Sequence, residues 1–180
     1  MKIGVLDIQG DVSEHLDILG RIGVDGVRVR KTKDLEGVSG LILPGGESTV
    51  IGPVMKQRGI TQFVTQRSLP LMGTCAGIIL MAKLVDGKPG VVPVLDIVIK
   101  RNGYGSQRES FETDLTISGI GNFRGVFIRA PVITGISGGE VLSSYRDHPV
   151  MVKEGKNLGL TFHPEIYGDE RIHRLFLDGL

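Results

Sequence analysis

The sequence predicts an α/β protein with three layers, in which helices cover both faces of a doubly wound, mostly parallel sheet. Over the first half, short apolar runs rich in β-branched residues alternate with segments of helical period, which is typical of βαβ units. Beyond Asp86, strand-like runs follow one another with little helical period. The second half is therefore expected to add mixed or antiparallel strands to the edge of the sheet.

The expected elements follow in chain order. In the first half, strands are expected at residues 2–8, 26–30, 41–43 and 69–72. Helices are expected after Ser13 as an N-cap, after Ser48 or Thr49 through Lys56, and at residues 78–82. In the second half, strands are expected at residues 91–100, 115–117, 126–128, 141–145, 150–152 and 158–162, with a last helix at residues 169–177. No repeat or linker divides the chain, so residues 1–180 are expected to form one domain.

Composition excludes several classes of function. The 180 residues carry 21 basic and 20 acidic side chains without a polybasic block, which argues against a nucleic-acid partner or an anionic membrane surface. A single cysteine excludes a disulfide framework and a multi-thiolate zinc site and fits the cytoplasm. The early charge at Asp7 argues against a signal peptide, and no apolar run is long enough for a bilayer.

No phosphate-binding loop, dinucleotide fingerprint or His-Glu-x-x-His motif is present, so neither a cofactor nor a metal is expected.

The only thiol, Cys75, lies in the string Gly73-Thr74-Cys75-Ala76-Gly77, between an apolar strand and an apolar helix. A lone cysteine most often packs as a small buried hydrophobe. A nucleophile flanked by glycines two positions away on each side, after a strand, is instead typical of a nucleophile elbow. The elbow exposes the sulfur at the carboxyl edge of the sheet, over the N-terminus of the next helix, where a thiolate is favoured. This local pattern favours a nucleophile.

A cysteine nucleophile needs a base, because an unperturbed thiol is mostly protonated at neutral pH. His163 follows an expected strand directly, and Glu165 comes two residues later, where a carboxylate could hold the imidazole and stabilise its charged form. The alternative is an ordinary strand-ending turn with an exposed histidine. The other three histidines, His15, His148 and His173, are expected to be solvated or capping residues.

A thiolate attacking an acyl carbon also needs donors for the oxyanion. By elbow geometry one donor is the backbone N–H of Ala76. The Gly45-Gly46 turn after the third strand is the natural source of the other, because the loops after parallel strands meet at one edge of the sheet. On its own the double glycine is an ordinary turn.

Together these residues resemble the class I glutamine amidotransferases, which have a flavodoxin-like fold, and within them the glutaminase subunit of pyridoxal 5′-phosphate synthase. The resemblance extends over nearly the whole chain in family order. Its segments are Gly4-Val5-Leu6 through Gln9-Gly10 with Glu14-His15, Leu43-Pro44-Gly45-Gly46-Glu47-Ser48-Thr49, Gly73-Thr74-Cys75-Ala76-Gly77, Arg101-Asn102 with Tyr104-Gly105 and Gln107, Ser110-Phe111-Glu112, Phe127-Ile128-Arg129-Ala130-Pro131, and Phe162-His163-Pro164-Glu165.

The resemblance implies that Cys75 is the nucleophile, His163 the general base and then acid, and Glu165 its orienting partner. It implies an oxyanion hole at Gly46 and Ala76 and hydrolysis of L-glutamine to glutamate and ammonia through a γ-glutamyl thioester. Glutamine would be held by Gly46, Glu47, Ser48, Arg101, Ile128 and Arg129. The charges agree, because the ammonium of glutamine needs an acid and its carboxylate an arginine.

The resemblance also implies a partner. Ammonia would pass to a separate synthase subunit in a large hetero-oligomer, which would combine it with a pentose phosphate and a triose phosphate to make pyridoxal phosphate. Gln9 and His15 lie in the segment that sits near the active site and the partner in relatives, so a role in activation is expected for them.

Three alternatives remain open. The chain could serve another acceptor, such as imidazole glycerol phosphate synthase, although the segments at residues 101–112 and 127–131 argue against this. It could be a non-catalytic glutamine-binding module, which the intact Cys, His and Glu set disfavours. It could also be a thiol-dependent hydrolase of the same layered fold, which the match at the glutamine-binding loop disfavours.

Overall fold

The computed structural model describes residues 1–101, 103–104 and 110–180. Its main sheet has the spatial order β11 (Glu140–Tyr145), β12 (His148–Glu154), β13 (Asn157–Leu160), β4 (Leu71–Thr74), β3 (Gly40–Leu43), β1 (Lys2–Leu6) and β2 (Asp25–Val29). The five strands from β13 to β2 run parallel, whereas β12 and β11 are antiparallel to their neighbours. This confirms the predicted α/β fold with a mostly parallel sheet and antiparallel edge strands.

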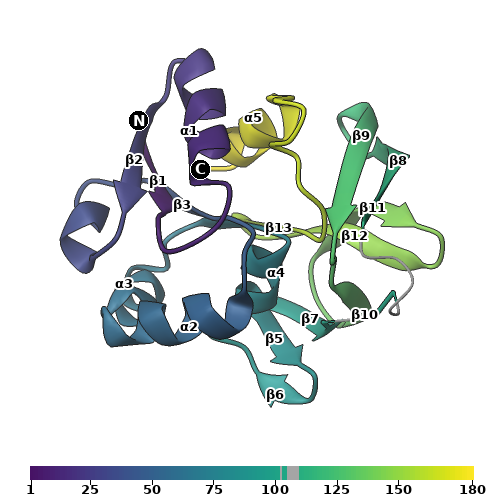
Figure 1. The fold of residues 1–180 in the computed structure, drawn as a ribbon, viewed down its shortest axis with the longest axis horizontal. Helices are drawn as coiled ribbons and strands as arrows, with labels where there is room; N and C mark the ends of the chain where they lie inside the picture. The colour runs from purple at the N-terminus through teal and green to yellow at the C-terminus, as the bar shows by residue number, and fades with distance from the viewer. Residues whose placement is uncertain (102, 105–109) are drawn as a thin grey trace.

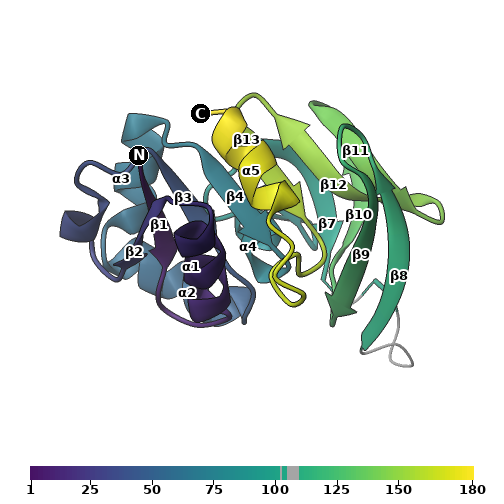
Figure 2. The same cartoon turned by 90° about the horizontal axis from the view of Figure 1, so that it is seen from above.

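Helices cover both faces of this sheet. Figures 1 and 2 show α1 (Val12–Arg21) and α5 (Arg171–Asp178) on one face, and α2 (Ser48–Gln57), α3 (Ile60–Arg67) and α4 (Ala76–Met81) on the other. A short 3-10 helix, η1 (Thr32–Leu35), follows β2. The predicted three layers are therefore present.

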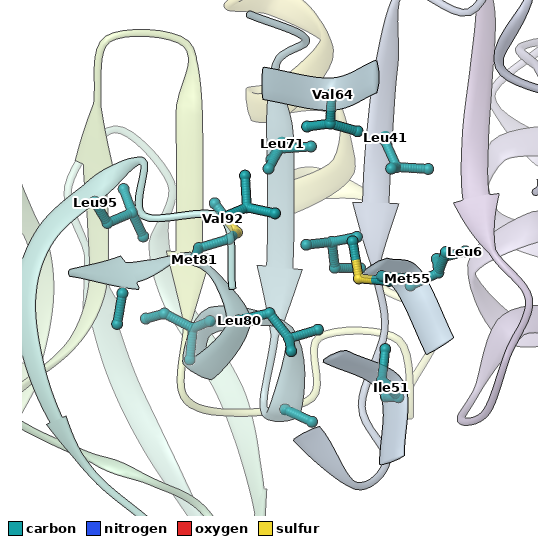
Figure 3. Packing of buried hydrophobic residues seen from close by; sticks show 14 of the residues in the cluster. Leu6, Leu41, Ile51, Met55, Val64, Leu71, Leu80, Met81, Val92 and Leu95 are labelled. Atoms are coloured by element: carbon teal, nitrogen blue, oxygen red, sulfur yellow. The ribbon is translucent and has the colours of Figure 1, made fainter. Parts of the chain in front are cut away.

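Alternation along the central strands explains the two faces. In β3, Leu41 and Leu43 belong to the core cluster beneath α2, α3 and α4, whereas Ile42 belongs to the cluster beneath α1 and α5. A strand that is apolar at every position has no solvent-facing side, so both of its faces must be covered. Figure 3 shows the first cluster, where Ile51 and Met55 of α2 pack toward the strands. This packing fixes the strand ends that carry the site.

Two smaller sheets complete the described fold. One has the order β10 (Val132–Ile136), β7 (Leu95–Lys100), β5 (Ala82–Val85) and β6 (Lys88–Pro89). The other is the antiparallel ribbon of β8 (Ser110–Ile117) and β9 (Gly121–Ile128). We expected all strands of the second half to extend the main sheet, and for these two smaller sheets the expectation is wrong. The ribbon instead packs across the sheet, with the ring of Phe127 4.6 Å from Phe111 and 5.5 Å from Phe162.

The first helix begins differently from the prediction. Asp11, not Ser13, is the N-cap of α1, and no side chain caps the helix. The hydroxyl of Ser13 instead accepts a hydrogen bond from Arg28 on β2 at 3.0 Å. The second helix starts after Glu47, one residue before the expected cap.

The structure also contains elements that the sequence did not predict, namely η1, α3, β5, β6 and β10. Among the described residues, no helix has both the length and the apolar character needed to cross a bilayer.

Candidate active site

Cys75 lies in a tight turn between β4 and α4 with φ +51° and ψ −102°, a backbone conformation that residues other than glycine rarely adopt. Both flanking glycines are required sterically. A Cβ at Gly77 would lie 1.9 Å from the carbonyl oxygen of Leu43, and one at Gly73 would lie 2.6 Å from the carbonyl carbon of Gly77. The backbone N–H of Cys75 donates to the carbonyl of Leu160 at 2.9 Å. The turn therefore has the geometry of a nucleophile elbow.

His163 and Glu165 lie in the loop after β13, the strand adjacent to β4. Nδ1 of His163 is 2.7 Å from Oε1 of Glu165, and both residues are buried. The backbone N–H of His163 donates to the carbonyl of Val126 at 2.8 Å, which anchors the loop on β9. His163 and Cys75 line the same cavity, and the thiol acts on the imidazole by raising the pKa of His163. The three side chains thus interact in one chain.

The electrostatics favour an ion pair in this chain. Burial lowers the pKa of His163, but the hydrogen bonds and charges of Cys75 and Glu165 outweigh burial and raise this pKa to about 10. Burial raises the pKa of Glu165, while the imidazole of His163 acts in the opposite direction. A His163 that holds its proton at neutral pH can give that proton to a leaving group.

The Gly45-Gly46 turn follows β3, the neighbour of β4 on its other side. A Cβ at Gly45 would lie 2.6 Å from Cε1 of His163, so this turn packs directly against the imidazole. Gly46 has φ +128°, which favours glycine. Oε1 of Gln9 accepts a hydrogen bond from the backbone N–H of Glu47 at 2.9 Å. This bond holds the backbone of Glu47, the residue directly after Gly46. The loops after β13, β4 and β3 therefore meet at one sheet edge, as expected for parallel strands.

A cavity of about 1010 Å³ opens over the sulfur. The residues of the predicted glutamine site that line it are Gly46, Glu47, Ser48, Arg101, Ile128 and Arg129, together with Cys75, Ala76 and His163. Asn102, Gly105 and Gln107, which contribute to the resemblance, lie outside the described residues. The cavity thus collects side chains of both signs around a thiol.

Two lining residues have contacts that the sequence did not reveal. Nε of Arg101 is 2.6 Å from Oδ2 of Asp86, and this bond lowers the pKa of the Asp86 carboxyl. Among the described residues, neither terminal amino group of the Arg101 guanidinium has a hydrogen-bond partner, so both can donate to a ligand. Arg129 has φ +45° directly after β9, and the carbonyl of Ile128 accepts a hydrogen bond from the Cys75 sulfur at 3.6 Å. Asp86 could not be identified as a site residue because its contact with Arg101 spans a strand.

Asp11 adds a carboxylate at the cavity wall. Its Oδ2 lies 3.4 Å from Nδ1 of His163, and Asp11, His163 and Glu165 bring possible ligand atoms within 4.8 Å of one another. Because the pKa of His163 is raised, we interpret the cluster of Asp11, His163 and Glu165 as two carboxylates around an imidazolium. No sequence motif indicated Asp11.

His15 and His173 lie behind this cluster. Both side chains are fully buried, so the expectation that they are solvated is wrong. His15 has helical spacing with the buried residues Val12 and Leu19 on α1, and His173 with Phe176 on α5. That spacing was the available signal, because buried apolar residues three and four positions away mark the inner face of a helix.

The chain matches the SNO glutamine amidotransferase family over residues 5–180. It belongs to this family. Among its relatives within the SNO family, a pyridoxal 5′-phosphate synthase subunit PdxT of Thermus thermophilus is 48% identical over 183 residues, covering 98% of this chain and 96% of the relative. The subunit of the same name from Staphylococcus haemolyticus is 47% identical over 180 residues, covering 99% and 98%.

Solved structures agree with membership of the SNO glutamine amidotransferase family. A crystal structure of a glutamine amidotransferase superimposes with a TM-score of 0.93 at 48% identity and covers 98% of this chain and 97% of its own. The PurLQS structure from Thermotoga maritima has a TM-score of 0.75 at 16% identity, covers 98% and 97% of the two chains, and shows a shared fold only.

Proposed function

We propose that this chain is the glutaminase subunit of a pyridoxal 5′-phosphate synthase, which hydrolyses L-glutamine to L-glutamate and ammonia. One observation carries the proposal: the only cysteine lies in a positive-φ elbow and lines the same cavity as His163, whose Nδ1 is 2.7 Å from Glu165. A thiol, an imidazole and a carboxylate in this order are the parts of a nucleophilic triad. Membership of the SNO glutamine amidotransferase family supports glutamine as the substrate.

The first half-reaction forms a thioester. With His163 in its protonated imidazolium form, the sulfur of Cys75 attacks the side-chain amide carbon of glutamine as a thiolate. A C–S bond forms, and the carbonyl oxygen becomes negative. We assign the backbone N–H groups of Gly46 and Ala76 as donors to this oxyanion. His163 then protonates the amide nitrogen, the C–N bond breaks, and ammonia leaves a γ-glutamyl thioester on Cys75.

The second half-reaction regenerates the ion pair of Cys75 and His163. His163, now neutral, takes a proton from water as the water oxygen attacks the thioester carbon. The C–S bond breaks, the sulfur leaves as a thiolate paired with the imidazolium of His163, and glutamate is released. In both halves Glu165 holds the imidazole by its Nδ1 and stabilises the charged form.

Substrate recognition follows from the charges around the cavity. We assign Glu47 to the ammonium of glutamine and Arg101 and Arg129 to its carboxylate, with Ser48 and Ile128 completing the wall. Because Asp86 binds Nε of Arg101, it orients the guanidinium for this contact.

The ammonia needs an acceptor. We propose that the chain, acting as a single domain in the cytoplasm, docks on a synthase subunit in a hetero-oligomer. Gln9 is our candidate for transmitting activation by the partner, because it holds the backbone of Glu47 beside the proposed oxyanion donor Gly46. The names of the relatives support this acceptor over that of other glutaminases.

The substitution Cys75→Ala tests the reaction. We expect it to lower kcat for ammonia release from glutamine by ~10³-fold or more, since it removes the nucleophile and changes little else. Thr116→Ala, at an exposed position on β8, is the matched control and should retain full activity. Thermal unfolding of both variants verifies the fold. Persistent hydrolysis by the Cys75→Ala protein would reject the assignment.

A further inference from the structure

The proposed mechanism uses one oxygen of Glu165 and leaves the other unassigned. Oε1 contacts His163, but Oε2 is buried and has no hydrogen-bond partner among the described residues. Nε2 of His15 lies 3.7 Å from it. A buried carboxylate oxygen without a donor is costly, so its surroundings call for an explanation.

His15 belongs to a buried pair of histidines from two helices. Nδ1 of His15 on α1 lies 2.9 Å from Nε2 of His173 on α5, and neither side chain is exposed. Figure 2 shows these two helices side by side on the same face of the sheet. Nε2 of His15 also lies 3.5 Å from the hydroxyl of Thr74, the residue before the nucleophile. The histidine pair therefore lies next to Glu165 and to Thr74, on the side of the triad away from the cavity.

Proton positions in this pair can be assigned from the neighbouring atoms. Burial first, and then the charges of His173 and His163, hold the pKa of His15 well below its usual range, while burial and Arg21 lower the pKa of His173 to about 4. Both rings are therefore neutral at pH 7, and each has one donor and one acceptor nitrogen.

One arrangement of the protons satisfies the polar atoms best. If Nε2 of His173 donates to Nδ1 of His15, then Nε2 of His15 carries a hydrogen, and its two nearby acceptors are the Thr74 hydroxyl at 3.5 Å and Oε2 of Glu165 at 3.7 Å. The remaining atom, Nδ1 of His173, is then an acceptor, which agrees with its lack of a partner among the described residues. The reverse arrangement would aim a lone pair at the carboxylate and bury an unsatisfied N–H, which costs more.

We infer that His15 is a positioning residue for the proposed glutaminase reaction: its Nε2–H supports Oε2 of Glu165, and His173 fixes its tautomer. The support holds the carboxylate in the orientation that keeps Oε1 on His163. This inference rests on the proposed function, and it gives His15 an internal role in place of a contact on the protein surface.

Three variants test this role. His15→Leu removes the donor, whereas His15→Gln offers an amide N–H near the position of Nε2. Leu19→Ala removes buried volume from the same helix without touching Glu165. We expect His15→Leu to lower kcat for glutamine by about 10- to 100-fold with KM within about twofold, and His15→Gln to recover most of the loss. Leu19→Ala should lose stability but keep kcat.

A second readout is independent of glutamine. Cys75 is the only thiol, so its rate of alkylation by iodoacetamide reports on the Cys75–His163 pair alone. We expect the pH profile of alkylation to shift in His15→Leu and to return toward wild type in His15→Gln. The charged groups that face the cluster and also shape this profile are Asp11, His163, Glu165, Arg21 and Asp169.

The outcomes separate this inference from the proposed function. A folded His15→Leu protein with wild-type kcat and an unchanged alkylation profile would overturn the inference and leave the proposed function intact. Equal losses in His15→Leu, His15→Gln and Leu19→Ala would reduce His15 to a packing residue. If the wild-type chain releases no ammonia even with a synthase subunit present, the proposed function fails, and the alkylation profile still decides the role of His15.

Discussion

The backbone of Cys75 is strained at φ +51°, in a region that costs roughly 1–3 kcal/mol for a residue with a side chain. Such strain persists only where surrounding contacts hold it. Here the contacts are the hydrogen bond from the Cys75 N–H to Leu160 and the two glycines that have no room for a Cβ. The same contacts aim the sulfur into the cavity. The sequence could predict this position because a single thiol lay between a strand and a helix with glycines on both sides.

Other residues could not be assigned so well. His163 and Glu165 are two positions apart, so their contact was visible in the sequence. His15 and His173 are brought together only by the packing of α1 against α5. Asp86 reaches Arg101 across a strand. A single sequence does not specify such long-range pairs, and polar residues were expected at the surface.

The burial of His173 predicts a pH dependence of stability. Burial lowers its folded pKa to about 4, below the ordinary ~6.5 of the unfolded chain. Between these values the unfolded chain binds a proton that the folded protein does not, so stability falls as pH drops from 6.5 to 4, by about 3 kcal/mol for this group. Urea unfolding of wild type and His173→Gln from pH 7.5 to 4.5 measures the slope, which should be shallower in the variant.

The control is His148→Gln, which changes a partly exposed histidine on β12. It should keep the wild-type slope. Equal slopes in all three proteins would show that His173 does not have the lowered pKa.

At the scale of elements, the site depends on three neighbouring parallel strands. The loops after β3, β4 and β13 carry the Gly45-Gly46 turn, Cys75 and His163, and the sheet order places these strands side by side. The apolar runs and glycine breaks of the first half predicted β3 and β4, whose loops meet at one edge as expected. The sequence could not predict that β5, β6, β7 and β10 form a second sheet, because strand pairing depends on contacts between distant segments.

The approach of α4 to β3 predicts a strong effect at Gly77. A Cβ there would lie 1.9 Å from the Leu43 carbonyl oxygen, so Gly77→Ala must push the helix away from the sheet. We expect the free energy of unfolding to fall by ~2–4 kcal/mol and ammonia release to be largely lost. Urea unfolding and a glutaminase assay measure both.

Gly20→Ala is the matched control, because Gly20 lies within α1 and its Cβ would meet no atom within 4 Å. This variant should gain ~0.5–1 kcal/mol from helix propensity and keep its activity. A Gly77→Ala protein that behaves like Gly20→Ala would contradict the packing described for the elbow.

At the scale of the whole molecule, the cavity over Cys75 has room for an amino acid, and its wall contains carboxylate and guanidinium groups that suit glutamine. The relatives are named as subunits of a pyridoxal 5′-phosphate synthase, and in the proposed function the ammonia formed here passes to a synthase partner. The account therefore makes this chain one half of a two-subunit enzyme. Sequence motifs predicted this role through family resemblance. They did not predict the docking surface, because contacts with the partner define that surface.

The most direct test follows the amide nitrogen of glutamine. The chain is mixed with a pyridoxal 5′-phosphate synthase subunit, a pentose phosphate, a triose phosphate and glutamine labelled with ¹⁵N in the side-chain amide, in the presence of excess unlabelled ammonium. Mass spectrometry of the pyridoxal phosphate formed is the measurement. The account predicts ¹⁵N enrichment above that of the free ammonium pool with the wild-type chain and none with Cys75→Ala. Product without label, or equal labelling with Cys75→Ala, would contradict it.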